Sequence, residues 1–327
     1  MGNDKITVII PIYNSIKHLK TCLDSVCAAI DRYGNAELIL VDNGSTDGSY
    51  ELAREDYGRK AKVHQIEDAT IAALRNHGAR GASGEYLSFI DSDFAIPQDY
   101  FRQGLALFSK LACVGLVCKL ELPPSPNWIE ETWWRLHWRA RDGYVPLYGG
   151  TCIIKRTAFE KVGGFKEALL TDEDWELGVR LAAAGLRIYE SSGLTGVHLG
   201  EPGNAGEFFR RHIWHGLGML RDLKSVWRNK PLLMTVAHFA LSVIGAASLL
   251  LPWGDLLKRV AVFVLFSAFA PGVTVLVRWA RIRKVYRPLR SFLLYYLYFS
   301  ARVLALLKLI SMRGRPHKRP QEHSPRT

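Results

Sequence analysis

Apolar runs of strand length recur along the first two hundred residues, and segments with helical periodicity separate several of them. The runs ITVIIPI (6–12) and ELILV (37–41) are mainly apolar, as expected of strands buried on both faces of a sheet. Between them, apolar residues at spacings of three and four predict a helix with one apolar face: Ile16, Leu19, Leu23, Val26 and Ile30. Further strands are predicted at 62–66, 85–90, 113–117, 148–154 and 195–199. The alternation predicts an α/β fold, a mostly parallel sheet covered by helices.

The pattern changes after residue 230. The segment 232–251 holds twenty residues without a formal charge, and 260–277 holds eighteen. Because a helix rises about 1.5 Å per residue, twenty residues span about 30 Å, the thickness of a bilayer core. We therefore expect two membrane-spanning helices, with two buried helices of a soluble domain as the alternative. A third apolar stretch, 292–310, contains Arg302 and Lys308 and is rich in tyrosine, which favours a helix lying in the membrane interface.

These patterns predict three parts of the chain. Residues 1–230 form the α/β domain, 231–310 form membrane-associated helices, and 311–327 form a basic, disordered tail. The stretch PPSPN (123–127) is interpreted as a loop within the first part rather than as a domain boundary.

The positive charge is concentrated at the C-terminal end. Thirteen Lys and Arg and one acidic residue lie between Arg278 and Thr327, which equals the whole net charge of +12. A nucleic-acid-binding domain carries its basic patch on the folded module, so this distribution indicates an anionic membrane surface and no nucleic acid. Basic residues also precede 232–251 and follow 260–277. The positive-inside rule therefore predicts a hairpin with both ends in the cytoplasm.

Acidic residues stand where predicted strands end or a helix begins, and ligands bind at the carboxyl ends of strands in open parallel sheets. Asp42 follows the run 37–41, and the pair Asp91 and Asp93 follows 85–90. Two carboxylates two positions apart on an extended loop can reach one centre if a divalent cation neutralises them, and oxygen ligands suit Mg²⁺ or Mn²⁺. A third group opens a predicted helix, where acids have the simpler explanation of stabilising the helix dipole: Asp172, Glu173 and Asp174.

The order of the motifs resembles that of the family 2 glycosyltransferases. The motifs are IIPIYN (9–14), VDNGSTD (41–47), ARGASGEYLSFIDSD (79–93), GGTCIIKRTAFEKVGGF (149–165) and TDEDWELGVRLAAAG (171–185). The resemblance covers roughly residues 5–200. It implies an inverting enzyme that uses a nucleotide diphospho-sugar and has one Rossmann-like α/β domain, with helices on both faces of the sheet.

The resemblance also implies roles for individual residues. The base and ribose of the nucleotide would be bound by Pro11, Tyr13, Asn14, Asp42 and Asn43, with Arg75 of an R-N-x-G motif near the base. The ribose or the donor sugar would meet Asp91 and Ser92. Asp93 would be the direct ligand of Mg²⁺ or Mn²⁺, His198 would lie near the diphosphate and the metal, and Asp174 would be the catalytic base.

The expected chemistry agrees with these roles. Departure of a nucleoside diphosphate leaves negative charge that a bound cation stabilises, and one aspartate about 3 Å from the acceptor hydroxyl suffices as base. With the membrane segments, this suggests transfer from a donor, expected to be UDP-linked, to a polyprenyl-linked or other cell-envelope glycan acceptor. The enzyme would lie at the inner or plasma membrane among its lipids, with the catalytic domain in the cytoplasm.

Other interpretations remain at this point. A sugar-nucleotide pyrophosphorylase should show a G-x-G-T-R loop near its N-terminus and a dehydrogenase a G-x-G-x-x-G loop; neither follows IIPIYN. A membrane-tethered sugar-binding or scaffold protein without turnover would keep the same fold. Arg75 can also be read as a surface arginine of a helix, and His198 as a core histidine. The aromatic cluster around Trp133 suits a sugar-docking surface, an interfacial belt or a helix packed on a core.

Overall fold

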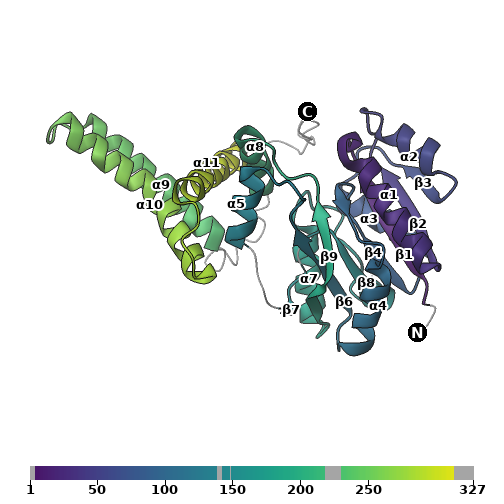
Figure 1. Ribbon diagram of the computed structural model, residues 1–327. Helices are drawn as coiled ribbons and strands as arrows, with labels where there is room; N and C mark the ends of the chain where they lie inside the picture. The colour runs from purple at the N-terminus through teal and green to yellow at the C-terminus, as the bar shows by residue number, and fades with distance from the viewer. Residues whose placement is uncertain (1–3, 138–141, 148, 218–229, 313–327) are drawn as a thin grey trace. The chain divides into compact units, whose positions relative to one another are not determined.

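The computed structural model describes residues 4–137, 142–147, 149–217 and 230–312, and it divides into two compact units (Figure 1). Unit 1 comprises Met1–Pro124 and Ala140–Glu201, and unit 2 comprises Ser125–Arg139 and Pro202–Thr327. The interpretation of 123–127 as a loop inside one domain is therefore corrected, because the chain passes from unit 1 to unit 2 at this stretch. Proline has no N–H to donate to a sheet ladder, so the two prolines before Ser125 suit the exit from the sheet.

Unit 1 is built on a nine-stranded sheet with the order β3-β2-β1-β4-β8-β6-β9-β5, and β7 pairs with β9. The strands are β1 (Ile6–Ile12), β2 (Ala36–Asp42), β3 (Ala61–Gln65), β4 (Tyr86–Phe89), β5 (Phe94–Ala95), β6 (Gly115–Glu121), β7 (Gly143–Val145), β8 (Cys152–Lys155) and β9 (Ile188–His198). Neighbours among β1 to β4 pair in parallel, as do β6 and β9, whereas β8 runs antiparallel between β4 and β6. The sheet is therefore mixed but mostly parallel.

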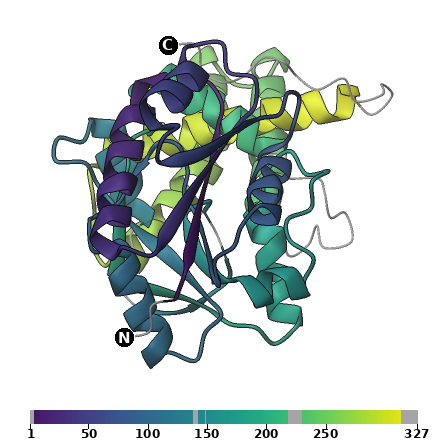
Figure 2. The same ribbon diagram turned by 90° about the vertical axis from the view of Figure 1, so that its right-hand side faces the viewer.

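Helices cover both faces of this sheet, as predicted (Figure 2). They are α1 (Ile16–Tyr33), α2 (Ser49–Tyr57), α3 (Ile71–Arg80), α4 (Tyr100–Lys110), α6 (Arg156–Lys161) and α7 (Glu173–Ala183). Alternate residues of β1 point to opposite faces: Val8 joins the apolar layer of α1 and α4, and Ile9 joins that of α3, α6 and α7. A strand that is buried on both faces is apolar along most of its length, which is why β1 and β2 could be predicted from the sequence.

The short strands could not be predicted from the sequence. β5 and β7 have two and three residues, too few for any periodicity to show. β9 begins at Ile188 rather than 195. Its early part has no regular alternation of buried and exposed positions, and its ladder with β6 shifts register between Cys118 and Lys119. Position 148 of the predicted strand 148–154 lies outside the described residues, and β8 begins at Cys152.

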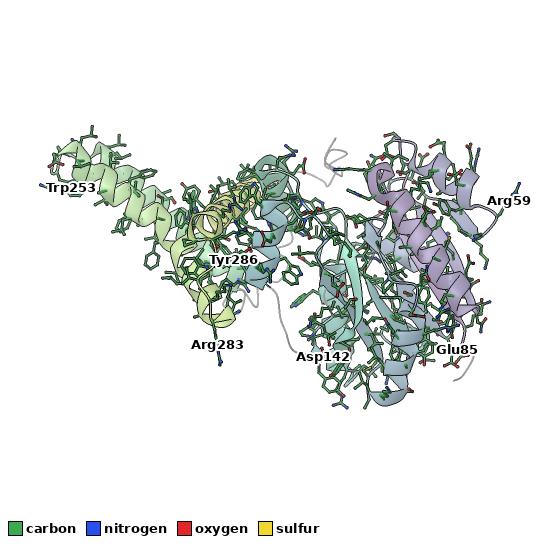
Figure 3. All side chains as sticks on the ribbon, viewed as in Figure 1. Arg59, Glu85, Asp142, Trp253, Arg283 and Tyr286 are labelled. Carbon is green, nitrogen blue, oxygen red and sulfur yellow. The ribbon has the colours of Figure 1, made fainter. Side chains whose placement is uncertain are left out.

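Unit 2 is helical. Its described helices are α5 (Trp128–His137), α8 (Ala205–Gly216), α9 (Lys230–Leu250), α10 (Leu256–Ile282) and α11 (Pro288–Met312). By length and composition α9, α10 and α11 are each long and apolar enough to cross a membrane. Helices α9 and α10 pack side by side, and a Cβ at Gly245 would lie only 3.1 Å from Phe263 Cα, so a glycine permits this close approach. Trp253 and Arg283 mark the two ends of α10 (Figure 3).

Two of the predictions made from the sequence concern unit 2. The third apolar stretch is one continuous helix, α11, that qualifies for a span by the same measure as α9 and α10; its interfacial position stays a prediction. The indole of Trp133 packs against Phe208, Tyr295 and Tyr298 of α8 and α11, so within unit 2 this tryptophan belongs to a packed helix. The proposed tail, 311–327, lies outside the described residues apart from its first two positions.

Candidate active site

The loop after β2 is organised by Asp42. Its carboxylate is fully buried, and Oδ1 accepts hydrogen bonds from the amides of Gly44 (2.9 Å) and Ser45 (3.0 Å) and from Gln65 Nε2 (3.1 Å). The Ser45 hydroxyl donates to Oδ2 at 2.5 Å. Asp42 thus fixes the backbone of this loop through both carboxylate oxygens. Asn43 also holds a loop, because its Oδ1 accepts from the amide of Ala69 at 2.8 Å.

The end of β1 connects this loop to the one that follows β4. The amide of Asn14 donates to Ser45 Oγ (3.0 Å), and Asn14 Oδ1 accepts from the amide of Thr46 (2.9 Å). Asn14 has φ of 45°, a left-handed conformation that asparagine tolerates better than most residues. Ser15 Oγ then lies 2.7 Å from Ser92 Oγ. Of the other predicted nucleotide-binding residues, Pro11 is buried within β1 and Tyr13 is 41% exposed.

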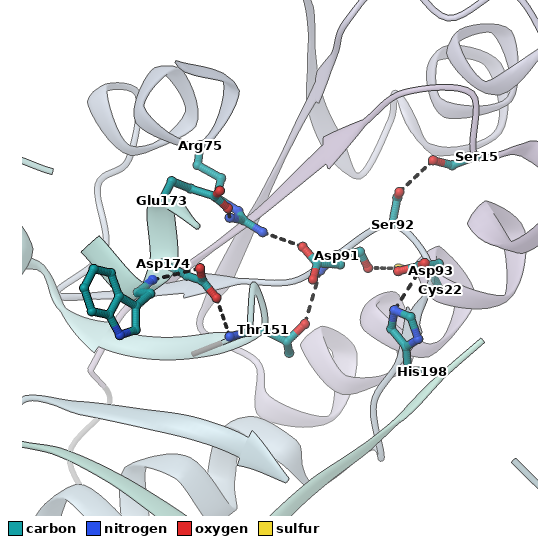
Figure 4. Close-up of polar contacts among 12 residues, drawn as sticks. Ser15, Cys22, Arg75, Asp91, Ser92, Asp93, Thr151, Glu173, Asp174 and His198 are labelled. Carbon is teal, nitrogen blue, oxygen red and sulfur yellow. Dashed lines mark hydrogen bonds and ion pairs between the residues drawn. The ribbon is translucent and has the colours of Figure 1, made fainter. Parts of the chain in front are cut away.

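Arg75 bridges two acidic groups that are far apart in the sequence. Its guanidinium donates from Nη2 to Asp91 Oδ1 and from Nη1 to Glu173 Oε1, each at 2.5 Å (Figure 4). The side chain of Arg75 is only 1% exposed, so the alternative of a surface arginine is wrong. Glu173 does begin α7, but it is also buried, and burial raises its pKa. The simple interpretation of Glu173 as a helix-start residue is therefore incomplete.

The segment Gly149-Gly150-Thr151 touches all parts of this group. The Gly149 amide donates to Asp174 Oδ2. A Cβ at Gly150 would lie 2.0 Å from Arg75 Nη2 and 2.3 Å from Asp91 Oδ1, so only glycine fits there. Thr151 Oγ1 accepts from the amide of Asp91 at 3.3 Å. Close approach of this backbone thus sets the spacing between the Asp91 loop and the start of α7.

Asp174 has the environment of a candidate base. Its carboxylate accepts hydrogen bonds from the amides of Gly149 and Trp175, the latter at 2.8 Å. Burial raises the pKa of Asp174 above 3.8, its ordinary value, although both amides and the nearby Arg75 oppose the shift. A raised pKa makes the carboxylate a better proton acceptor than an exposed aspartate.

Asp93 and His198 form a second polar group next to Asp91. His198 Nε2 lies 3.3 Å from Asp93 Oδ2, and His198 Nδ1 lies 3.1 Å from Glu201 Oε1. His198 thus lies between two carboxylates, and a carboxylate on the Nδ1 side of an imidazole is the usual second-shell neighbour of a histidine that binds a metal through Nε2. The pKa of the neighbouring His18 is lowered, first by burial and then by Lys17, and Asp93 and His198 are close enough to act on it as well.

The side chains of Asp93 and His198 fit a hard divalent cation that takes its remaining ligands from water and substrate. Among the described residues no group of three His, Cys, Asp and Glu side chains converges as a complete metal site. Mg²⁺ and Mn²⁺ commonly take one or two protein ligands and fill their remaining positions with water and substrate phosphates. Neighbouring ligands of an octahedral ion with bonds of about 2.1 Å lie about 3 Å apart, close to the 3.3 Å between Asp93 and His198. The residues present therefore fit a cation held jointly with a diphosphate.

Comparison with known proteins identifies the family of this chain. The family model described as "Glycosyl transferase family 2" matches residues 7–163, and that described as "Glycosyl transferase family group 2" matches residues 86–312, more than half of the chain. This chain is a family 2 glycosyltransferase. The resemblance seen in the motifs is thus confirmed, and the family is that of glycosyltransferases rather than of pyrophosphorylases. Turnover by this chain and inversion of the anomeric carbon stay predictions.

Individual relatives of this glycosyltransferase match different shares of its chain. Glycosyltransferase GlyA of Streptococcus pneumoniae is 43% identical over 100 residues, 30% of this chain and 14% of GlyA. O-antigen biosynthesis protein RfbC of Myxococcus xanthus is 28% identical over 212 residues, 57% of this chain and 16% of RfbC. The chain thus spans less than a fifth of the length of these two relatives. Mannosyltransferase PcManGT from Pyrobaculum calidifontis, in complex with GDP-Man and Mn²⁺, has a similar fold, with a TM-score of 0.60 and 19% identity over 94% of this chain and 87% of that one.

Several residues of the glycosyltransferase site carried no clear signal in the sequence. Glu201 follows β9 by three positions in a loop, without a motif around it. Gln65 ends the edge strand β3 and contacts Asp42 only because β2 and β3 pair in register. Gly200 lies against Asp93, where a Cβ would meet Oδ2 at 1.9 Å. Glu173 was visible in the sequence as part of the acidic group 172–174, but its burial against Arg75 was not.

Proposed function

We propose that this family 2 glycosyltransferase transfers a sugar from a nucleotide diphospho-sugar, UDP-linked, to a hydroxyl of a lipid-linked or cell-envelope glycan. Transfer proceeds in one displacement that inverts the anomeric carbon and uses Mg²⁺ or Mn²⁺. The observation that carries the proposal is the bridge of Arg75 between Asp91 and Glu173. This bridge holds the acid loop after β4 beside the residue that precedes Asp174.

The nucleotide end of the donor lies over the loop after β2 and the end of β1. Asp42 shapes this loop from beneath, since its oxygens are occupied by loop and strand donors. The exposed ring of Tyr13 is available to stack on the base. Asn14, Asn43 and Ser92 hold the surrounding segments together.

Asp93 and His198 hold the cation and, through it, the diphosphate. When bound, the cation offsets the negative charge that develops on the leaving nucleoside diphosphate. Glu201 orients the imidazole of His198. Asp91, held by Arg75 and Thr151, faces the donor sugar. PcManGT, which has a similar fold, is in complex with GDP-Man and Mn²⁺, a donor and a cation of the classes proposed here.

Asp174 removes the proton from the attacking hydroxyl. The carboxylate is oriented by two amide donors and has a raised pKa, so it accepts a proton readily at neutral pH. Attack from the side of Asp174 while the diphosphate leaves on the side of Asp93 gives inversion in a single step.

The candidate membrane helices support a lipid-linked acceptor. The candidate spans α9 and α10 keep the enzyme at a membrane, and the name of RfbC associates that relative with O-antigen synthesis. A lipid-linked glycan presents its sugars at the same surface. By the positive-inside rule, the basic residues that flank the spans favour a cytoplasmic position for unit 1.

Asp174→Asn tests the base directly. The variant keeps the shape of the side chain and one of its two acceptor oxygens, and Asp174 does not contact the proposed donor residues, so donor binding should be unchanged. Transfer should fall by about 10²-fold or more, the usual contribution of a general base. Binding is measured by thermal shift with a panel of nucleotide sugars and Mn²⁺, and transfer by release of nucleoside diphosphate with acceptor present.

Two results would reject parts of the proposal. Near-wild-type turnover of Asp174→Asn removes this residue from the role of base. A product that retains the anomeric configuration, established by NMR of the glycoside, excludes a single displacement. As a matched control, Asp142→Asn changes an aspartate that caps Ser192 near β9 and should leave both binding and transfer intact.

A further inference from the structure

Unit 1 leaves few large apolar side chains in contact with solvent. Among its described residues these are Tyr13 (41%), Ile16 (40%), Tyr144 (48%), Trp175 (52%) and Val179 (45%). Tyr13 and Ile16 lie at the end of β1, beside the proposed nucleotide site. Trp175 and Val179 belong to α7, the helix that begins next to the proposed base. A tryptophan that is half exposed beside a catalytic group is unusual enough to suggest a ligand.

The two residues of α7 form one exposed apolar strip. Residues four apart lie on the same side of a helix, so Val179 follows Trp175 along the surface. The opposite side of α7 is buried, through Leu177 and Leu181. Gly178 lies so close to the backbone of Leu147 that a Cβ would meet its nitrogen at 2.8 Å. This contact fixes the rotation of α7 about its axis, and hence the exposure of the strip.

The backbone amide of Trp175 contacts the proposed base, Asp174. Its amide donates to Asp174 Oδ1 at 2.8 Å, so the indole begins within one residue of the carboxylate that takes the proton. The attacking hydroxyl must lie about 3 Å from that carboxylate. The ring that carries this hydroxyl therefore lies within a few ångströms of residue 175, on the acceptor side of the reaction.

We propose that Trp175 forms an acceptor subsite, in which the apolar C–H face of a pyranose ring stacks on the indole. Val179 extends the subsite by one turn toward the next unit of the acceptor. The inference rests on the proposed function, because it takes Asp174 as the base. A planar aromatic surface binds a sugar through dispersion and burial without fixing every hydroxyl, which suits an acceptor that is presented by a larger glycan.

The test uses the full chain in phosphatidylcholine nanodiscs, which contain no sugar. The acceptor probes are octyl α- and β-glycosides of glucose, galactose, mannose and N-acetylglucosamine, and the donor is the nucleotide sugar hydrolysed fastest by the wild type. Hydrolysis without acceptor reports the donor site and the base. Transfer reports the acceptor subsite. The variants are Trp175→Ala, Trp175→Phe and, as a matched control, Tyr144→Ala, which removes an aromatic ring of similar exposure on β7.

Trp175→Ala should raise the acceptor KM by about tenfold, in line with the loss of one stacking contact, while hydrolysis stays within about twofold. Trp175→Phe should restore KM to within about threefold, and Tyr144→Ala should behave as wild type. A change in KM alone identifies lost binding rather than lost catalysis. Acceptor glycosides should also alter tryptophan fluorescence in the wild type and less so in Trp175→Phe.

Four outcomes would overturn the subsite. One is an unchanged acceptor KM in Trp175→Ala. Another is an equal fall in hydrolysis and transfer, which would mean that Trp175 acts only by positioning Asp174. The third is hydrolysis by the wild type without transfer to any glycoside. The fourth is a Trp175→Ala variant that loses only its binding to phosphatidylcholine vesicles. Absence of hydrolysis with every nucleotide sugar would instead reject the proposed function.

Discussion

Arg75 Nη2 lies 2.5 Å from Asp91 Oδ1, and the arginine is buried although it carries a full charge. The same guanidinium contacts Glu173, which is 98 positions away in the sequence. The cost of burying a charge is offset only when the partners and hydrogen bonds are in place. Arg75 is therefore a positioning residue that joins α3, the loop after β4 and the start of α7.

Replacement of Arg75 should destabilise unit 1 strongly. Arg75→Met leaves Asp91 and Glu173 without their cation, and breaking a buried pair in this way costs about 3–5 kcal/mol. Arg80→Met on the same helix removes an exposed pair with Glu167 and should cost about 0–1 kcal/mol. Thermal denaturation of both variants compares them. Equal stability of the two would show that the Arg75 bridge contributes nothing.

Gly150 should be intolerant of a side chain for a reason specific to the site. In Gly150→Ala the methyl group would meet Arg75 and Asp91 at 2.0–2.4 Å, so the Asp91 loop must move away from α7. We expect transfer to fall by about tenfold or more, as displacements of about 1 Å do at active sites. Gly143→Ala is the control, because no atom lies within 4 Å of its Cβ. Steady-state kinetics compares transfer by the two variants. Normal transfer by Gly150→Ala would show that close approach of residue 150 to Arg75 and Asp91 is not needed.

The sequence was informative where burial or chemistry repeats in a regular pattern. The runs 6–12 and 37–41 correspond to β1 and β2, because parallel strands covered on both faces are mostly apolar. The motifs placed Asp91, Asp93 and Asp174 at the ends of elements, since such positions are occupied by polar residues for chemical rather than packing reasons.

The partners of these residues could not be predicted. Arg75 reaches Asp91 and Glu173 only after α3 and α7 pack on the same face of the sheet, a consequence of topology that no local pattern records. Glu201 and Gln65 depend likewise on where β9 and β3 end. The division into two units could not be predicted from the sequence either. Helix α5 lies between strands of unit 1 along the chain but packs with α8 and α11 of unit 2.

The raised pKa of Asp174 predicts a dependence of stability on pH. Because the folded chain raises this pKa, it binds the proton more tightly than the unfolded chain, and ionisation of Asp174 destabilises the fold as pH rises above 3.8. Asp174→Asn removes this titration, although its single acceptor oxygen leaves one of the Gly149 and Trp175 amides without its acceptor at every pH. The melting temperature of the variant minus that of the wild type should therefore rise as pH increases from 3.8 to 7. A difference that stays constant or falls over this range would show that the fold does not raise the pKa of Asp174.

Glu201 should control metal affinity without touching the metal. Glu201→Gln weakens the hold on His198 Nδ1, and loss of such a second-shell partner reduces metal affinity by about 10–100-fold. Mn²⁺ titration followed by electron paramagnetic resonance, in the presence of UDP, measures this directly. Glu85→Gln is the control, because Glu85 precedes β4 whereas the site follows it. Equal Mn²⁺ affinity in both variants would remove His198 from the metal site.

The α9–α10 hairpin predicts opposite labelling of its two ends. Trp253 lies in the turn between the helices and Arg283 follows α10, and basic residues cluster at the Arg283 end, including Arg281 and Lys284. By the positive-inside rule, Trp253→Cys should react with a membrane-impermeant maleimide in intact cells and Arg283→Cys only after permeabilisation. The native background should be low, because all five cysteines are buried and burial raises the pKa of Cys152, for example, to about 12.

A third reporter distinguishes the two placements of α11. If α11 lies in the interface, Ser311→Cys at its far end should be labelled on the same side as Arg283→Cys. If α11 spans the bilayer, Ser311→Cys should instead match Trp253→Cys. We expect the first pattern, because Arg302 and Lys308 lie within the helix and basic residues flank it on both sides. Labelling of Trp253→Cys and Arg283→Cys from the same side would refute the hairpin itself, since one crossing by α10 must separate them.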